Sequence, residues 1–483
     1  MAGPERRVCD VLVIGASASG VCAAVQAART GLNTILCEPT YWVGGMLTAA
    51  GVSAFDGNDG LPSGMFGEFR SAVHDWYGGA RAVRTGWVSE TLFEPWVGQN
   101  ILRGWISDCP SLEVHHLQQC LEVLVEGGRV EGAVFSSMLV RASVTVFADE
   151  YGDLVELAGL PWRTGLESRT ETGEQLAPRY AHAIPQDVTW AATIKTPPSG
   201  FAAGLPEPVF SADDPLHQVR GEPELSWDEF LDYGRLPNDY VMLNFPTHDV
   251  GGNYLDSALR KEVLREAWER TNHLVTGLQT SFGKDRVVLP NIYPGHMAAI
   301  PYIREARRIR AVNTLHLEDL IDPMSSPLRS DAIAVGDYPV DHHRSNDGAA
   351  PLLQFPEVKA FSVPYGVMVP DSMDGLLVAE KSIGVTGLVN GCTRLQPVVM
   401  QLGQAAGLAA SLCVGDGIEP RAVCVSRLQD ELLERGGMLV PARDVPPSHS
   451  RFAELHRAVV RGTVNLRYES GGWTNRAYLE PDY

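Results

Sequence analysis

The segment near the amino terminus constrains the fold more than any other part of the chain. Residues 8–14 are almost continuously apolar and β-branched, which predicts a strand buried on both faces. The small-residue stretch from Gly20 to Thr30 predicts a helix that ends at Gly31, and residues 34–37 predict a second buried strand. Strand, helix and strand within about thirty residues make a βαβ unit. We therefore expect an α/β fold with a parallel sheet and a right-handed crossover.

The turn between this strand and this helix is typical of a dinucleotide site. Gly15 permits the tight turn and Gly20 lets the helix lie close to the sheet, so that free N–H groups can hold a pyrophosphate. Ser17 replaces the middle glycine of the usual motif, which makes the turn alone a weak signal. Glu38 strengthens it, because a carboxylate at the end of the second strand can accept both ribose hydroxyls of an adenosine and disfavours a 2′-phosphate. The alternative is an ordinary βαβ turn without a ligand.

The residues after Glu38 carry a resemblance to a known family. Pro39 and the segment Gly44-Gly45-Met46 resemble the FAD-dependent oxidoreductases of the glutathione-reductase-like superfamily, in the branch labelled xanthan-lyase-like or FAD-dependent oxidoreductase. Further segments resemble this family in the same order along the chain: 151–159, 302–309, 337–343, 376–380, 391–394 and 402–407. The resemblance implies a three-layer FAD-binding, Rossmann-like domain with an inserted substrate or cap domain, and FAD bound noncovalently.

The resemblance also implies which residues hold the cofactor. A helix over 398–413 follows Arg394, and its N-terminus would stabilise negative charge near N1 of a reduced flavin, unless it is only a small-residue core helix. Many relatives carry a histidine in place of Gly387 and a serine in place of Cys392, and we expect Cys392 to be an unreactive buried thiol rather than a thioether to flavin. The expected cofactor-binding set is Gly15, Ser17, Ala18, Ser19, Gly20, Glu38, Pro39, Gly44, Gly45, Met46, Cys120, Glu380, Arg394 and Gln404.

The candidate catalytic residues are histidines and an arginine. His343 leads, because it lies in a segment that the resemblance places near the active site, and His342 and His296 follow. Each of them could equally satisfy hydrogen bonds in a polar loop. Arg304 shares one face of an expected helix with Arg307 and Arg308, where it could clamp a carboxylate or the electron-rich edge of a flavin, or belong to a structural ion-pair network.

The chain divides into four expected parts. Residues 1–160 and 291–420 would form the FAD-binding domain, residues 161–290 the substrate or cap module, and residues 421–483 a carboxy-terminal extension. Within them we expect alternating strands over 112–147 with a hairpin turn at 126–129, a helix over 257–280 with Asp256 as N-cap, and a buried strand at 374–379.

Charge and composition exclude several classes of function. The 39 basic and 59 acidic residues give a net charge of −20, which disfavours nucleic acid and anionic membranes as partners. No apolar run reaches the roughly 20 residues of a membrane-spanning helix, and no signal peptide is recognisable, so we expect a cytoplasmic protein. Eight scattered cysteines without a CxxC pair predict free thiols, and no spacing predicts a metal site. Residues 56–60 resemble a calcium loop only superficially, because Gly67 stands at the twelfth position, and we expect a mobile surface loop.

The function expected from these features is that of an FAD-dependent oxidoreductase, an oxidase or dehydrogenase. It would move a hydride from a small polar substrate, such as an alcohol, amine or sugar-like compound, to N5 of the flavin. Two alternatives stay open: a flavin-dependent non-redox lyase or isomerase, and a non-catalytic protein that keeps the flavin as a structural element.

Overall fold

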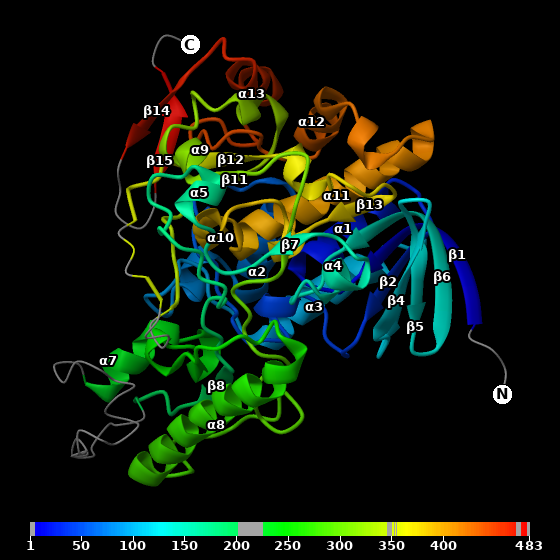
Figure 1. The fold of residues 1–483 in the computed structure, drawn as a ribbon. Coiled ribbons are helices and arrows are strands. Elements are labelled where there is room, and N and C mark those ends of the chain that lie inside the picture. The colour runs from blue at the N-terminus through cyan, green and yellow to red at the C-terminus, as the bar shows by residue number, and fades with distance from the viewer. Residues whose placement is uncertain are drawn as a thin grey trace.

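The fold is organised around a seven-stranded sheet. The computed structural model describes all residues except 1–4, 201–225, 345–349, 352, 354, 470–474 and 481–483. The strands lie in the order β3-β2-β1-β6-β5-β4, and β13 also pairs with β6 (Figure 1). The pairs among β1, β2, β3, β6 and β13 are parallel, whereas β4, β5 and β6 form an antiparallel meander. The sheet strands are β1 (Glu5–Ile14), β2 (Thr34–Glu38), β3 (Leu112–His116), β4 (Cys120–Glu126), β5 (Arg129–Phe135), β6 (Met138–Phe147) and β13 (Leu376–Val378).

The expected βαβ unit is present. Helix α1 (Ala18–Arg29) connects β1 to β2, and the two strands pair in parallel from Val11 opposite Thr34 to Ile14 opposite Cys37. Alternate residues of β1 enter different cores: Val11 and Val13 face the core that contains α1, whereas Leu12 and Ile14 face the opposite one. This division explains the continuous apolar run in the sequence, because both faces of the strand are covered.

The core on the α1 side depends on one long helix, α11 (Gln396–Asp416). Its glycines face α1: a Cβ at Gly403 would overlap the carbonyl oxygen of Ser19, and one at Gly407 would lie 2.5 Å from that of Ala23. The small residues predicted over 398–413 therefore serve close helix packing. Helix α11 is also long and apolar enough to cross a membrane, but 83% of its most apolar window is buried inside the protein.

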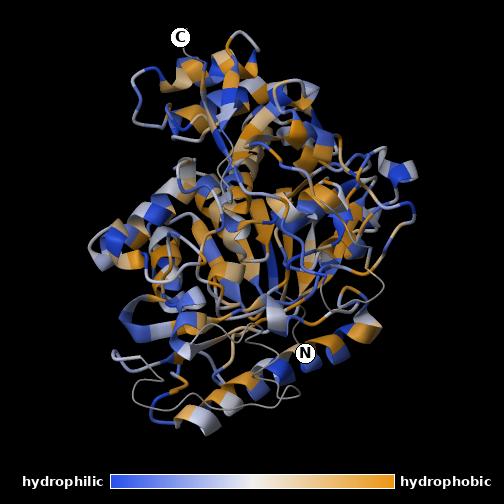
Figure 2. Cartoon of the chain, turned by 90° about the vertical axis from the view of Figure 1, so that its left-hand side faces the viewer, coloured by the Kyte–Doolittle hydropathy of each residue, from blue (hydrophilic) through white to orange (hydrophobic). Residues whose placement is uncertain are grey.

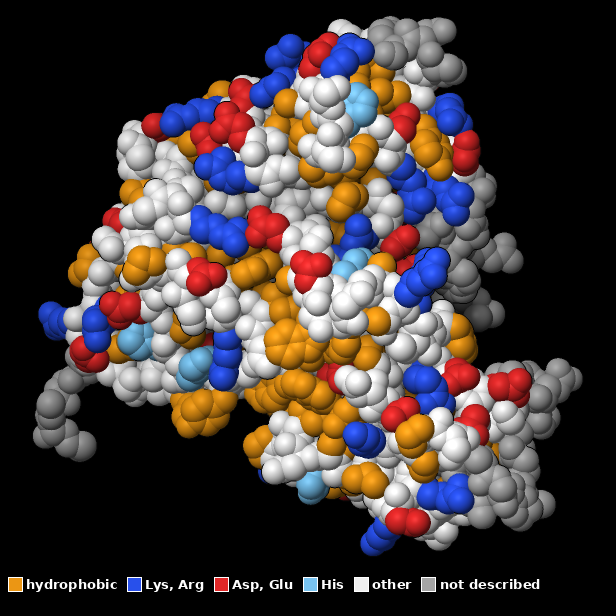
Figure 3. Space-filling view, turned by 180° about the vertical axis from the view of Figure 1, so that it is seen from behind, with side chains coloured by type: hydrophobic (Ala, Val, Ile, Leu, Met, Phe, Trp, Pro, Cys, Tyr) orange, Lys and Arg blue, Asp and Glu red, His pale blue; other side chains and the backbone are white. Residues whose placement is uncertain are grey.

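The lower part of the molecule in Figure 1, formed mainly by described residues between Ala192 and Met297, has a hydrophobic core of its own. Strands β8 (Ala192–Lys195) and β9 (Tyr240–Leu243) pair there, next to α7 (Trp227–Leu231) and the long helix α8 (Ser257–Phe282). Asp256 caps α8 as expected, since its side chain accepts a hydrogen bond from the N–H of Ala258 at 2.8 Å. Apolar residues gather in the middle of the molecule, and α8 carries both kinds of residue (Figure 2). From behind, hydrophobic side chains gather where the main body meets this lower part (Figure 3).

The remaining elements complete the layers and the carboxy-terminal region. These elements include two short antiparallel strand pairs, β11 with β12 and β14 with β15. The remaining strands are β7 (Trp162–Arg163), β10 (Arg308–Ile309), β11 (Ala332–Gly336), β12 (Phe361–Pro364), β14 (Leu466–Glu469) and β15 (Arg476–Leu479). The remaining helices are α2 (Gly64–Tyr77), α3 (Pro95–Ser107), α4 (Asp153–Leu157), α5 (Arg169–Thr172), α9 (Leu317–Ile321), α10 (Gly387–Thr393), α12 (Val425–Glu434) and α13 (Phe452–Val460).

Two local expectations are wrong. Residues 302–309 are not helical but extended, and Arg308 and Ile309 form β10, which pairs with β7. The loop 56–60 is not a free surface loop, because Asn58 is buried and its side-chain amide donates to the carbonyl of Val335 at 2.8 Å. The expectation for the thiols is confirmed: all eight cysteines are free, and only Cys424 is exposed.

Candidate active site

A cavity of about 230 Å³ lies at the carboxyl ends of β1, β2 and β6, and we call it the strand-end cavity. Gly15 lines it with φ at +99°, and a Cβ there would lie 2.5 Å from the carbonyl oxygen of Ala148. Only glycine therefore fits this turn. Ser17, the residue in place of the usual middle glycine, is the N-cap of α1 and accepts the N–H of Gly20 at 3.1 Å.

Glu38 presents a fixed carboxylate to this cavity. One oxygen accepts the N–H of Ala16 at 2.7 Å, and the other accepts the N–H and the hydroxyl of Thr40 at 2.9 and 2.8 Å. Burial raises the pKa of this carboxyl, although these hydrogen bonds oppose the rise. The arrangement holds the acidic side chain where the end of β2 meets the glycine turn, the place of an adenosine ribose in a dinucleotide fold.

The structure brings together only part of the expected cofactor set. Gly15, Ser17, Glu38, Pro39, Gly45 and Cys120 line the strand-end cavity. Ala18, Ser19 and Gly20 form the first turn of α1 beside it, and Gly44 and Met46 belong to the neighbouring tight turn. Two predicted residues lie elsewhere. Gln404 accepts the N–H of Met65 at 3.0 Å within the core, and Arg394 pairs with Asp341 at 2.7 Å beside the second cavity described below.

A buried lysine between two glutamates lies next to the strand-end cavity. The ammonium of Lys381 pairs with Glu380 at 2.9 Å and with Glu150, which lines the cavity. The other oxygen of Glu380 accepts the N–H of Ser19 at 3.4 Å, so a carboxylate already occupies the N-terminus of α1. Burial raises the pKa of Glu150 to about 8. Among the described residues, Oε1 of Glu150 has no hydrogen-bond partner.

A second and larger cavity of about 920 Å³ adjoins the lower part of the molecule, and we call it the aromatic cavity. Eight aromatic side chains line it: Phe55, Phe66, Trp87, Phe230, Tyr233, Phe245, Tyr302 and Tyr338. The two cavities share one wall, the extended segment 300–304. Ile300, Pro301 and Ile303 line the strand-end cavity, whereas Tyr302 and Arg304 line the aromatic cavity.

His343 enters the wall of the aromatic cavity with both ring nitrogens next to carboxylates. Its Nδ1 lies 2.7 Å from Oδ2 of Asp249, and its Nε2 lies 3.4 Å from Oδ1 of Asp341. Asp249 is fully buried. Burial alone would raise its pKa, but the Arg304 charge and the hydrogen bond from His343 hold that pKa below its ordinary value. The ionised Asp249 therefore fixes the imidazole with a proton on Nδ1 and leaves Nε2 toward Asp341.

Arg304 pairs with Asp249 and is therefore not free to bind a substrate carboxylate or a flavin. One guanidinium nitrogen donates to the carbonyl of Asp187 and to the hydroxyl of Thr189, both at 2.9 Å, and the other lies 3.2 Å from Asp249. The expected face shared by three arginines does not exist, because Arg307 pairs with acids near α4 and Arg308 pairs with Glu167 and Glu305. In the extended segment each of them points to a different partner.

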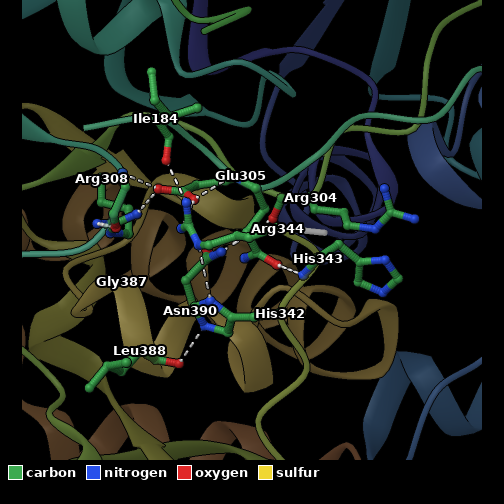
Figure 4. A network of polar contacts seen from close by, with 12 residues as sticks. Ile184, Arg304, Glu305, Arg308, His342, His343, Arg344, Gly387, Leu388 and Asn390 are labelled. Carbon is green, nitrogen blue, oxygen red and sulfur yellow. Dashed lines mark hydrogen bonds and ion pairs between the residues drawn. The ribbon is translucent and has the colours of Figure 1, made fainter. Parts of the chain in front are cut away.

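The other two histidines lie apart from this arrangement. Figure 4 shows the His342 ring turned toward Leu388, away from the ring of His343. Nε2 of His342 lies 3.1 Å from the carbonyl oxygen of Leu388, and burial, with help from the Arg344 charge, lowers the pKa of His342 to about 3. His296 is exposed and lines neither cavity, and its Nδ1 lies 3.4 Å from the carbonyl of Pro290. The structure therefore gives no support to His296 as a catalytic residue.

Both departures from the family pattern fall at tightly packed positions. A Cβ at Gly387 would overlap the carbonyl oxygen of Gly165, so the structure leaves no room there for a histidine. Cys392 is fully buried, and burial raises the pKa of its thiol far above the ordinary value. A thiol in that state is a poor nucleophile, which agrees with noncovalent binding of a cofactor.

Sequence reasoning missed three acidic residues of the aromatic cavity. Asp249 lies 94 positions from its partner His343, in a polar stretch without a motif. Asp341 lies in the segment 337–343, whose resemblance to the family points to the neighbouring histidines and not to this acid. Asp56 was assigned to a surface loop, yet it lines the cavity, and burial together with the charge of Asp341 raises its pKa to about 6.

No curated protein matches the chain. Similar solved structures include a geranylgeranyl bacteriochlorophyll reductase-like protein from Thermoplasma acidophilum, with 12% identity, 94% of this chain and 88% of that chain covered, and a TM-score of 0.37. They also include a flavin-dependent brominase, with 11% identity, coverage of 89% and 84%, and a TM-score of 0.38. At these scores, the likenesses add nothing about the substrate.

The family is shown by a match along the sequence. The model of the family described as FAD dependent oxidoreductase matches residues 10–432, nearly the whole chain. Gly15 and Glu38 lie within this match and line the strand-end cavity, so the residues present fit the adenosine half of FAD. The expected α/β fold class and the expected cofactor are confirmed. The chain belongs to the FAD dependent oxidoreductase family, and it is a flavin-dependent enzyme whose cofactor is FAD.

Proposed function

We propose that this enzyme oxidises a carbon next to oxygen or nitrogen in a small molecule bound in the aromatic cavity, with His343 as the proton acceptor. One observation carries the proposal: the hydrogen-bonded pair of His343 and Asp249 lies in the wall of a cavity that shares the segment 300–304 with the cofactor cavity. Hydride transfer requires the donor carbon and the acceptor to approach within about 3–3.5 Å, so substrate and flavin would meet at the edge of this shared segment.

Each half of the site has its own task. Glu38 would hold the adenosine ribose, and the turn that begins at Gly15 would hold the pyrophosphate. Bound FAD supplies an acceptor for a hydride, that is, for two electrons and one proton. The rest is done by the chain. The segment 300–304 lines both cavities, and its side chains would help to exclude bulk water where substrate and cofactor meet.

His343 takes the proton that leaves the substrate heteroatom. Nδ1 stays hydrogen-bonded to the buried Asp249, so Nε2 is the nitrogen that receives the proton. The resulting imidazolium is stabilised by carboxylates at both nitrogens, Asp249 at 2.7 Å and Asp341 at 3.4 Å. Arg304 and Arg394 keep these two carboxylates ionised, as the lowered pKa of each shows. Asp249 and Arg304 are thus positioning residues, and His343 is the catalytic one.

The lining favours one part of the expected substrate range. Apolar surface makes up most of the wall of the aromatic cavity, although charged and hydroxyl-bearing side chains also line it, so the wall suits a substrate with an apolar body better than a sugar. An alcohol or amine with an apolar body fits this lining better. The same cavity would also suit a non-redox lyase or a structural flavoprotein. The test must therefore measure reduction of the flavin.

The test is anaerobic mixing of the purified holoenzyme with a panel of aromatic alcohols and amines. Loss of the oxidised-flavin absorbance is expected with at least one of them, and His343→Gln should slow that loss by a factor on the order of 10²–10⁴ without loss of bound FAD. His296→Gln, a change of an exposed histidine outside both cavities, is the matched control and should react like the parent enzyme. Turnover without loss of absorbance would support the lyase, and no response to any compound would support the structural role.

A further inference from the structure

We propose that the aromatic cavity is built for a protonated amine with an apolar body, whose ammonium group pairs with the carboxylate of Asp56. This inference rests on the proposed function of the same cavity and names its substrate class. It is carried by three features of the described residues: the fixed position of Asp56, the pairing of every other charge in the wall, and a continuous aromatic surface.

The loop that carries Asp56 is held in place on both sides. Asn58 donates its backbone N–H to the carboxylate of Asp337 and its side-chain amide to the carbonyl of Val335 at 2.8 Å. Before Asp56, Ala54 forms a β-bridge with Leu92. Asp56 itself lines the cavity and is only partly exposed. Its carboxylate is therefore presented to the cavity by a rigid loop rather than by a mobile one.

Asp56 is the one carboxylate of the cavity wall that no cation of the described residues neutralises. Four carboxylates and three arginines line the cavity. The arginines have partners: Arg304 pairs with Asp249, Arg84 with Glu90, and Arg70 with Asp59 at 3.8 Å; Asp341 pairs with Arg394. Within the described part of the chain, Asp56 takes part in no hydrogen bond or ion pair, and the cavity keeps one uncompensated negative charge.

The aromatic side chains form one connected surface in this cavity. The rings of Phe230 and Phe245 stack with centroids 4.2 Å apart, Tyr233 lies 5.3 Å from Phe245, and Trp87 meets Tyr233 edge-on at 4.8 Å. Trp87 is 65% exposed, unusual for an indole that contacts another ring, and this places it at the entrance. Aromatic faces attract both an apolar body and the cationic group attached to it.

The same charges disfavour the other substrate classes. A carboxylate substrate would need a free cation, but the guanidinium of Arg304 is already bound to Asp249, Thr189 and Asp187. It would also be repelled by Asp56. A neutral alcohol would leave the Asp56 carboxylate without a counter-ion in a largely apolar wall, which is a costly arrangement. A protonated amine supplies the missing charge and the hydrogen-bond donors together.

The reaction that follows balances in protons and electrons. The ammonium first gives one proton to Nε2 of His343, while the Asp56 carboxylate stays ionised. The C–H bond on the carbon next to nitrogen then breaks, and its electron pair leaves with the hydrogen to FAD. The nitrogen lone pair forms the C=N bond, and the product is an iminium ion that water hydrolyses to a carbonyl compound and an ammonium ion, from ammonia when the substrate is a primary amine.

The test compares matched pairs of amine and alcohol on the holoenzyme at pH 7.5, where Asp56 is ionised. The pairs are benzylamine with benzyl alcohol, 2-phenylethylamine with 2-phenylethanol, and tryptamine with indole-3-ethanol, and their affinities are measured by titration calorimetry. At least one amine should bind about tenfold or more tightly than its alcohol, because a charge-assisted hydrogen bond is worth that factor. Asp56→Asn should abolish this preference and leave the affinity for the alcohol unchanged.

Controls separate this inference from the proposed function. Asp75→Asn, which removes an exposed carboxylate of α2, should keep the preference for the amine, and FAD content and melting temperature report whether each variant is folded. The inference is overturned if no amine binds better than its alcohol, or if Asp56→Asn retains the preference. Binding that depends on Asp56, with no loss of flavin absorbance for any amine, would uphold the inference and refute the proposed oxidation.

Discussion

Glu380 combines a strained backbone conformation with a buried charge. Its φ of +63° is in the left-handed region, where a residue other than glycine costs roughly 1–2 kcal/mol. It is fully buried, and its carboxylate accepts the N–H of Ser19 at the start of α1, where an FAD pyrophosphate is expected. Lys381 offsets the charge by pairing with Glu380 and Glu150. The lysine is therefore the cation that a bound pyrophosphate would share with two carboxylates.

Replacing Glu380 by glycine should tighten FAD binding. The change removes the backbone strain, frees the N–H of Ser19, and leaves Lys381 available to the pyrophosphate, so we expect the dissociation constant of FAD to fall about tenfold. Glu380→Gln removes only the charge and should give part of the gain. Quenching of flavin fluorescence measures both constants. Weaker binding by the glycine variant would mean that Glu380 supports the cofactor site instead of competing with it.

At the scale of single elements, the packing of α1 against α11 gives the sharpest prediction. Gly403→Ala places a methyl group against the carbonyl of Ser19 and should lower the free energy of unfolding by about 2 kcal/mol. Gly415→Ala, in the same helix but with open space around it, should raise that free energy by up to about 1 kcal/mol, since alanine favours a helix. Chemical denaturation measures both. Equal effects of the two changes would contradict the close contact.

The elements that the sequence predicted well are those with strong local signals. β1, α1 and β2 follow from an apolar run and small residues, and α8 follows from the Asp256 cap. The segment 302–309 was predicted wrongly, because its arginine spacing fits a helix while its conformation is set by tertiary contacts. Arg304 pairs with Asp249 and Arg308 with Glu167, at sequence distances of 55 and 141 residues. No local pattern contains such partners.

The residues of the candidate site fall into the same two groups, those with a local sequence signal and those without one. Gly15 and Glu38 were predictable because a βαβ unit places both at one end of the sheet. His343 was found through a resemblance, but its partner Asp249 and the carboxylate of Asp56 come from other parts of the chain. Their meeting depends on how the lower part of the molecule packs against the sheet. Neither composition nor residue spacing predicts that packing, so these residues could be assigned to the site only from the folded structure.

For the whole molecule, the pH dependence of the free energy of unfolding is set by three classes of buried titratable side chain. Seven carboxyls have a pKa raised mainly by burial: Glu38, Glu94 and Glu174 in direction, and Glu150, Asp149, Asp56 and Asp337 to about 8, 7, 6 and 6. Three histidines have a pKa lowered by burial to about 3 or 4, namely His248, His342 and His456. Four carboxyls in ion pairs have a lowered pKa, namely Asp153, Glu167, Asp249 and Asp341.

The sign of each contribution follows from which state binds protons more tightly. The carboxyls with a raised pKa bind protons more tightly when folded, so they favour folding increasingly as the pH falls from about 8. The buried histidines bind protons more tightly when unfolded, and their cost begins below about 6.5, the ordinary pKa of histidine. The paired carboxyls also hold protons more tightly when unfolded, and the stability that they contribute is lost below about 4.

Together these contributions predict a stability profile with a plateau on the acidic side of neutrality. The melting temperature of the protein should rise as the pH is lowered from 8.5 to about 6.5, because Glu150 and Asp149 take up protons in the folded state while the histidines are still neutral in both states. Between about 6.5 and 5 the carboxyls and the histidines nearly cancel, and below about 4 the melting temperature should fall steeply. Scanning calorimetry across this range measures the profile. A melting temperature that is highest at pH 8 would show that the carboxyls at the strand-end cavity stay ionised in the folded protein.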